Sequence, residues 1–170
     1  TQPFTFFFFK SIKPTGWLKR QLRIQADGLG GKLHTFWPDI KESQWIGGDQ
    51  EGWERVPYWL DGFIPLSYLL DSPELKQTAD FYMDYIINHQ ADDGWIGPFN
   101  TSNEERSSCD LWSHFLLSKV LWVYWTATAD ERVPRVMMKH YKALDYLIGH
   151  VPLFGWAHMR WFEVLIPIFG

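Results

Sequence analysis

Indole rings and carboxylates alternate along the stretch WIGGDQEGWERVPYWLDG, which begins at Trp45. Asp49, Glu51 and Glu54 fall within six consecutive positions, and Trp53 stands between the two glutamates. Carboxylates accept hydrogen bonds from hydroxyl groups, and aromatic faces stack on the C–H surface of a sugar ring. The stretch therefore indicates a loop that binds carbohydrate.

The same residues also have a purely structural interpretation, which the sequence leaves open. Glu51 and Glu54 would then cap a helix or pair with Arg55, while the tryptophan rings close the ends of helices. Glycosidic hydrolysis usually needs two carboxyl groups, about 5 to 5.5 Å apart for retention or about 6.5 to 9.5 Å apart for inversion. Sequence does not supply that distance, so no catalytic residue is assigned.

A second stretch, HQADDGWIGPFN, repeats this composition farther along the chain. Asp-Gly is a turn dipeptide, so we expect Asp93 and Gly94 to be structural and Trp95 to be the better candidate for a ligand contact. The predicted substrate-binding residues are therefore Trp45, Asp49, Glu51, Trp53, Glu54 and Trp95.

The sequence gives little indication of a serine hydrolase site, a metal site or a disulfide. Asp110 and His114 stand near several serines, but the chain lacks the G-x-S-x-G elbow, and Asp110 is explained as a helix cap. The histidines form no H-E-x-x-H pattern, and Cys109 is the single cysteine. The sequence therefore predicts neither a disulfide nor a metal site in this chain.

Composition narrows the classes of partner. The chain has 170 residues, 46% of them hydrophobic and 21% charged, with a formal net charge of −4. It has no basic run to gather phosphates, so we expect no nucleic acid partner.

The apolar run FLLSKVLWVYW is interrupted by Lys119 and is too short to span a membrane. Asn100-Thr101-Ser102 matches the glycosylation sequon, which matters only if the chain is secreted, and the compartment is not fixed.

The elements that must position these residues are all predicted to be helices. Strand-like alternation is not found, which predicts an all-α chain. Residues 32–56 are interpreted as one long structured loop. The helix that follows this loop contains Pro65, which is expected to kink it. The predicted helices run from Thr15 to Gly28, from 57 to about 70, from Ser72 to His89, from Asp110 past Tyr124, from Asp130 to Ile148, and from 157 to 169.

The connections between these helices alternate between long loops and short turns. Antiparallel helix pairs with this alternation usually form a solenoid or close into an alpha/alpha toroid, and six helices make about half of a twelve-helix ring. We therefore predict residues 12–170 to be an incomplete (alpha/alpha)6 toroid, preceded by a disordered or mispredicted segment, residues 1–11. A half ring leaves an apolar face uncovered, which predicts self-association through the open end.

Five stretches resemble, in order, the N-terminal half of the catalytic domain of the beta-L-arabinofuranosidase-like family, glycoside hydrolase family 127. They cover most of residues 12–129, and WAHMRW near the end agrees more loosely. The stretches are IKPTGWLKRQLRIQADGL, FWPDI, SQWIGGDQEGWERVPYWLDGFIPLSYLL, YIINHQADDGWIGP and VLWVYWTATADERV.

This resemblance implies an alpha/alpha toroid that hydrolyses a terminal arabinofuranosyl-type sugar. In the family, a cysteine nucleophile lies near zinc, which is bound by cysteines and a glutamate, and another glutamate is the acid/base. Those positions lie farther along than residue 170, Cys109 does not match them, and Cys109-Asp110-Leu111-Trp112 replaces the usual His-Glu-Leu-Tyr. The resemblance therefore implies a divergent fragment, inactive alone, that contributes substrate-binding residues. The alternative is a non-catalytic carbohydrate-binding or helical scaffold protein.

Overall fold

The structure, a computed structural model, describes residues 11–98 and 102–169. The predicted N-terminal segment 1–11 lies outside these residues except for Ser11. The described residues contain no strand, only an isolated bridge between Ser43 and Gln50, so the all-α prediction is confirmed. The elements are α1 (Gly16–Asp27), α2 (Leu29–Phe36), α3 (Pro38–Lys41), η2 (Gln44–Ile46), α4 (Arg55–Leu69), α5 (Pro73–Asn88), α6 (Asn103–Ser107), α7 (Trp112–Thr128), α8 (Arg132–His150), α9 (Gly155–Arg160), η3 (Trp161–Val164) and α10 (Leu165–Phe169).

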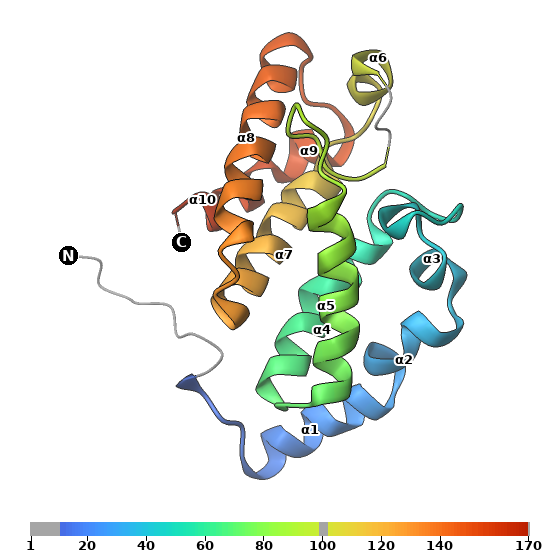
Figure 1. Ribbon diagram of the computed structural model, residues 1–170, viewed down its shortest axis with the longest axis vertical. Helices are drawn as coiled ribbons and strands as arrows, with labels where there is room; N and C mark the ends of the chain where they lie inside the picture. The colour runs from blue at the N-terminus through green and yellow to red at the C-terminus, as the bar shows by residue number, and fades with distance from the viewer. Residues whose placement is uncertain (1–10, 99–101, 170) are drawn as a thin grey trace, which may run out of the picture.

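Four long helices, α4, α5, α7 and α8, run along the long axis of the molecule, and α1 lies across the lower end of α4 and α5 (Figure 1). Short turns join α4 to α5 and α7 to α8 at that end, where Asp71 and Ala129 adopt positive φ angles of 53° and 60°. Longer segments lead into α4 and connect α5 to α7 at the opposite end. The predicted alternation of long and short connections is therefore confirmed, although the first long connection is partly helical.

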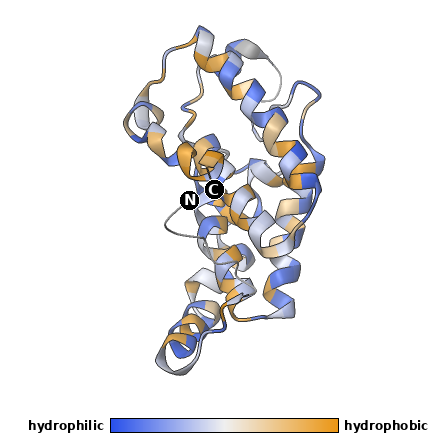
Figure 2. Cartoon of the chain, turned by 90° about the vertical axis from the view of Figure 1, so that its left-hand side faces the viewer, coloured by the Kyte–Doolittle hydropathy of each residue, from blue (hydrophilic) through white to orange (hydrophobic). Residues whose placement is uncertain are grey.

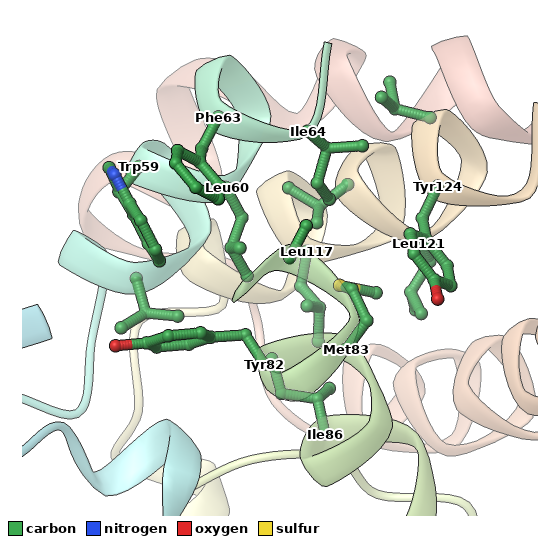
Figure 3. Packing of buried hydrophobic residues seen from close by; sticks show 14 of the residues in the cluster. Trp59, Leu60, Phe63, Ile64, Tyr82, Met83, Ile86, Leu117, Leu121 and Tyr124 are labelled. Carbon is green, nitrogen blue, oxygen red and sulfur yellow. The ribbon is translucent and has the colours of Figure 1, made fainter. Parts of the chain in front are cut away.

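The main core lies where α4 and α7 pack side by side against α5. Figure 3 shows Leu60 and Ile64 from α4 facing Met83 from α5 and Leu117 and Leu121 from α7. All of these side chains are fully buried. Burying one such side chain contributes about 1.5–3 kcal/mol, so this three-helix contact is a principal source of stability.

Helix α7 is buried on almost every side because α4, α8 and the C-terminal helices all contact it. Its one lysine, Lys119, remains half-buried and donates a hydrogen bond to the Asp61 carboxylate of α4 over 2.8 Å. The charge that interrupts the apolar run FLLSKVLWVYW therefore has a partner on the neighbouring helix.

No helix in the described part of the chain combines the length and the apolar character that crossing a bilayer requires.

The segment between α1 and α4 differs from the prediction of a single long loop. Its first half is helical, and it contains α2, α3 and the short η2. Gly31 lies inside α2, where a Cβ atom would stand 1.8 Å from the Ala26 carbonyl oxygen of α1. Only glycine allows the two helices to meet so closely at this corner, and a pattern of glycines alone does not distinguish that packing from a helix end.

The helix that contains Pro65 is continuous from residue 55 to residue 69, and the kink predicted at this proline stays a prediction. One expectation needs correction, because the single helix predicted for 157–169 is instead divided into α9, η3 and α10. Apolar side chains remain at the surface of α1 and of the C-terminal segment (Figure 2). They are Trp17, Leu18, Ile24, Phe154, Trp156, Met159, Trp161, Phe162, Ile166, Ile168 and Phe169.

Candidate functional site

The predicted site residues gather at the end of the molecule where α4 and α7 begin and α5 and α8 end, which we call the loop end. It lies toward the top of Figure 1. Segments distant in sequence meet here, because α4 and α7 run parallel and both present their N-termini to it. Their meeting point is the first turn of α7, which is linked to the other segments by hydrogen bonds and ring contacts.

A chain of hydrogen bonds joins these segments. The Trp45 indole Nε1 donates to the Trp53 carbonyl oxygen over 2.9 Å, and the Trp53 Nε1 donates to the Asp110 carbonyl oxygen over 3.2 Å. The Asp110 carboxylate then accepts from the backbone N–H of Trp112 at 3.1 Å, of Trp156 at 2.7 Å and of Ala157 at 2.9 Å. The N-cap of α7 is Leu111, one residue after the predicted cap, but Asp110 accepts from the first N–H of α7 and also holds the start of α9.

His114 lies at the centre of the loop end. The ring of Trp95 is 4.2 Å from its ring centroid, that of Trp45 is 5.7 Å away and that of His140, from α8, is 5.5 Å away. Among the described residues, neither ring nitrogen of His140 nor the Nδ1 of His114 has a hydrogen-bond partner. Burial therefore holds the pKa of His114 well below its usual range and lowers that of His140 to about 4. Both rings are neutral near pH 7.

Two carboxylates of the stretch that begins at Trp45, those of Glu51 and Glu54, contact residues at the start of α4. Glu51 accepts hydrogen bonds from the backbone N–H of Glu54 at 2.7 Å and of Arg55 at 3.2 Å. The Glu54 carboxylate is 3.6 Å from the Arg55 guanidinium, and Asp49 accepts from the Gln50 amide at 2.8 Å. Glu51 and Glu54 thus make the capping and pairing contacts of the structural interpretation, whereas Asp49 is exposed and makes no contact across the loop end that the structure records.

The second stretch behaves similarly. Asp93 accepts from the Trp95 backbone N–H at 3.1 Å and forms an ion pair with Arg106 at 2.5 Å. The hydrogen bond from Arg106 holds the pKa of Asp93 below its usual value. Gly94 adopts a φ of 97°, as a turn requires. The expectation that Asp93 and Gly94 are structural agrees with these contacts.

The structure thus brings the three predicted tryptophans together but leaves the three predicted carboxylates outside a common cavity. Trp45 and Trp95 are 2% and 1% exposed, while Trp53 is partly exposed. The Trp45 edge lines a groove of about 280 Å³ beside α5, and Trp95 lines a separate cavity of about 200 Å³ beside α8. Trp45 and Trp95 therefore border two separate hollows at the loop end, and the other four predicted residues line neither of these two.

Several residues of the loop end escaped the sequence reasoning. His140 lies 26 positions after His114, and no helical spacing relates the two histidines. Arg160 of α9 donates to the Tyr58 hydroxyl over 3.0 Å and stacks 4.3 Å above the Trp112 ring. The segment WAHMRW, residues 156–161, agrees only loosely with the family. Nothing in its spacing indicates the contact between Arg160 and Tyr58 of α4.

The residues present do not match the cysteine and zinc site that the resemblance implies. Within residues 11–98 and 102–169, no group of three or more histidine, cysteine or acidic side chains lies close enough to hold a metal ion. Burial raises the pKa of the Cys109 thiol to about 11, which keeps it protonated near neutral pH.

The chain matches no protein-family model, and it shows no significant similarity to a curated protein or to a solved structure. Its function must therefore be inferred from its own residues and their geometry.

Proposed function

We propose that this chain is part of a glycoside hydrolase of the beta-L-arabinofuranosidase-like type, in which the loop end contributes substrate contacts without supplying the catalytic groups. The substrate class is a terminal arabinofuranosyl-type sugar. The observation that carries the proposal is the meeting of Trp45, Trp53 and Trp95 at the start of α7, although more than 40 positions separate the first from the last. The resemblance of the five sequence stretches supports the same assignment.

The helix arrangement supports the toroid part of this proposal. An (alpha/alpha) toroid has an inner ring of parallel helices, each followed by an antiparallel outer helix. α4 and α7 would be two inner helices, since they run parallel in direct contact, and α5 and α8 would be the matching outer helices. The apolar side chains exposed on the C-terminal segment would then contact the rest of the ring or, without it, a second copy of the chain.

A second function, non-catalytic carbohydrate binding, is favoured by the state of the acidic residues. Glu51 is used as a helix cap and Glu54 is paired with Arg55. Neither is thereby free to act as one of a pair of catalytic carboxylates, yet the partly exposed ring of Trp53 remains available to bind a sugar. Sugar binding is common to both functions, and hydrolysis separates them.

The test of the shared function is a titration of the chain with arabinose-containing oligosaccharides, followed by ligand-observed NMR. Trp53 is the informative position because it is partly exposed at the loop end. We expect Trp53→Ala to weaken binding about tenfold or more, as removal of a stacking ring commonly costs more than 1 kcal/mol. Trp17→Ala is the matched control, since Trp17 is 73% exposed on α1, away from the loop end.

Two results would contradict the proposal: no binding of any oligosaccharide by the folded chain, or equal binding by the Trp53→Ala variant and the wild type. Release of arabinose by the isolated chain would refute the part of the proposal that assigns the catalytic groups elsewhere. Circular dichroism of each variant checks that the helices are retained.

A further inference from the structure

The groove beside α5 has a composition that sets it apart from the rest of the loop end. It encloses about 280 Å³ between the last turn of α5 and the two segments that precede α4 and α6. Within the described part of the chain, its lining contains aromatic rings, an amide and glycine backbone, and no lysine, arginine, aspartate or glutamate. The lining residues are Gln44, Trp45, Gly48, Tyr85, Ile86, His89, Gly97 and Pro98.

Two glycines with positive φ angles allow the groove walls to approach the aromatic rings. Gly47 has a φ of 81°, and a Cβ there would stand 2.2 Å from the Tyr85 hydroxyl. Gly97 has a φ of 96°, and a Cβ there would stand 2.2 Å from the Trp45 ring. A side chain at either position would collide with the neighbouring ring. Glycine at Gly47 and Gly97 therefore lets the backbone lie directly against Tyr85 and Trp45.

One wall of the groove is a stacked pair of rings. Tyr85 and His89, one helical turn apart, have ring centroids 3.8 Å apart and planes inclined by 13°. The His89 Nδ1 lies 2.8 Å from the Tyr85 carbonyl oxygen. A carbonyl oxygen only accepts, so Nδ1 carries a hydrogen and Nε2 is the ring nitrogen left to meet a ligand. The wall therefore offers a flat apolar surface, a phenol hydroxyl and one ring nitrogen.

We propose that this groove binds one neutral sugar unit of an oligosaccharide, with Tyr85 and His89 as its recognition residues. Aromatic rings suit the C–H face of the sugar, while the Gln44 amide, the Tyr85 hydroxyl and the His89 nitrogen can exchange hydrogen bonds with its hydroxyl groups. Among the described residues, the lining has no lysine or arginine to pair with a phosphate or carboxylate, which would lose hydration on entering the groove. The inference rests on the proposed carbohydrate function and deepens it, because it names the neutral sugar and adds residues to Trp45.

The experiment compares xylobiose, arabinobiose and cellobiose with galacturonic acid, using saturation-transfer NMR and calorimetry on the intact chain. Tyr85→Phe and His89→Phe keep the rings but remove one polar atom each. We expect each variant to bind the neutral disaccharide about fivefold to tenfold more weakly, as loss of one hydrogen bond costs about 1 kcal/mol. Phe81→Ala is the matched control, an exposed ring one turn before Tyr85 that does not line the groove. We expect it to bind as the wild type does.

The outcomes separate this inference from the proposed function. Binding that is insensitive to Tyr85→Phe and His89→Phe, but is lost in Trp53→Ala, overturns the groove and leaves the proposed function intact. Weaker binding in the groove variants, with no effect of Trp53→Ala, supports the groove and contradicts the assigned indole site. Failure of every neutral sugar to bind overturns both, and equal binding of galacturonic acid overturns the neutral specificity.

Discussion

Acidification should destabilise the loop end through the buried histidines, and replacement of His140 by phenylalanine should remove much of that sensitivity. His140 and His114 are fully buried side by side between α8 and α7, beneath Trp95 and Trp45. The backbone near the two rings approaches without reaching hydrogen-bond geometry, and the positive charge of Arg106 also disfavours a second cation. A proton on either ring would therefore have no compensating partner.

The sign and size of the effect follow from the pKa of His140. Burial lowers this pKa from its usual 6.5 to about 4, so the unfolded chain binds the proton more tightly than the folded chain. The contribution to stability is full above pH 6.5 and is lost as pH falls from 6.5 toward 4. Each unit of pKa difference corresponds to about 1.36 kcal/mol, which gives a loss of about 2 kcal/mol between pH 7 and pH 4.5. His114 adds a loss of the same sign.

Urea unfolding followed by circular dichroism at pH 7, 6, 5 and 4.5 measures this dependence. The wild type should lose at least about 2 kcal/mol over that range, and His140→Phe should lose less by about that amount. His150→Phe, an exposed histidine on the same helix, is the control and should keep the wild-type slope. If phenylalanine prevents folding, His140→Leu makes the same comparison. Identical slopes for the wild type and the His140 variants would refute the reasoning.

Two further predictions concern the scaffold of the loop end. Asp110→Ala removes the acceptor of three backbone N–H groups and should reduce the free energy of unfolding by about 2 kcal/mol, with faster proteolysis near Trp156 in limited digestion. Cleavage no faster than in the wild type would contradict the role of Asp110 in holding α9. Gly97→Ala places a methyl group 2.2 Å from the Trp45 ring at a φ of 96° and should cost about 2 kcal/mol or more in urea unfolding. Gly149→Ala, where a methyl group meets open space within α8, should be neutral or stabilising.

The candidate site was predictable in its residue types but not in its contacts. The density of indoles and carboxylates marks the stretch from Trp45 onward, and the structure places that stretch at the loop end. The contacts that each of these side chains makes depend on partners elsewhere in the chain. Glu51 becomes a cap because the first turn of α4 presents free N–H groups to it, and Trp53 is held by the carbonyl oxygen of Asp110, just before α7. His140 carries no local signal, since its neighbour His114 is brought to it only by the packing of two helices.

The sequence by itself determined the all-helical fold and the main helix boundaries. Ser72 followed by Pro73 sets the start of α5, and Asp130, one residue before the Glu131 N-cap of α8, accepts from the Arg132 backbone N–H at 2.9 Å. Such signals are local, because caps and prolines act within one helical turn. Tertiary structure alone decided that Gly31 is a point of helix contact and that Tyr85, His89 and Trp45 share a groove. These features arise from side chains far apart in sequence, whose distances are fixed only when the helices pack.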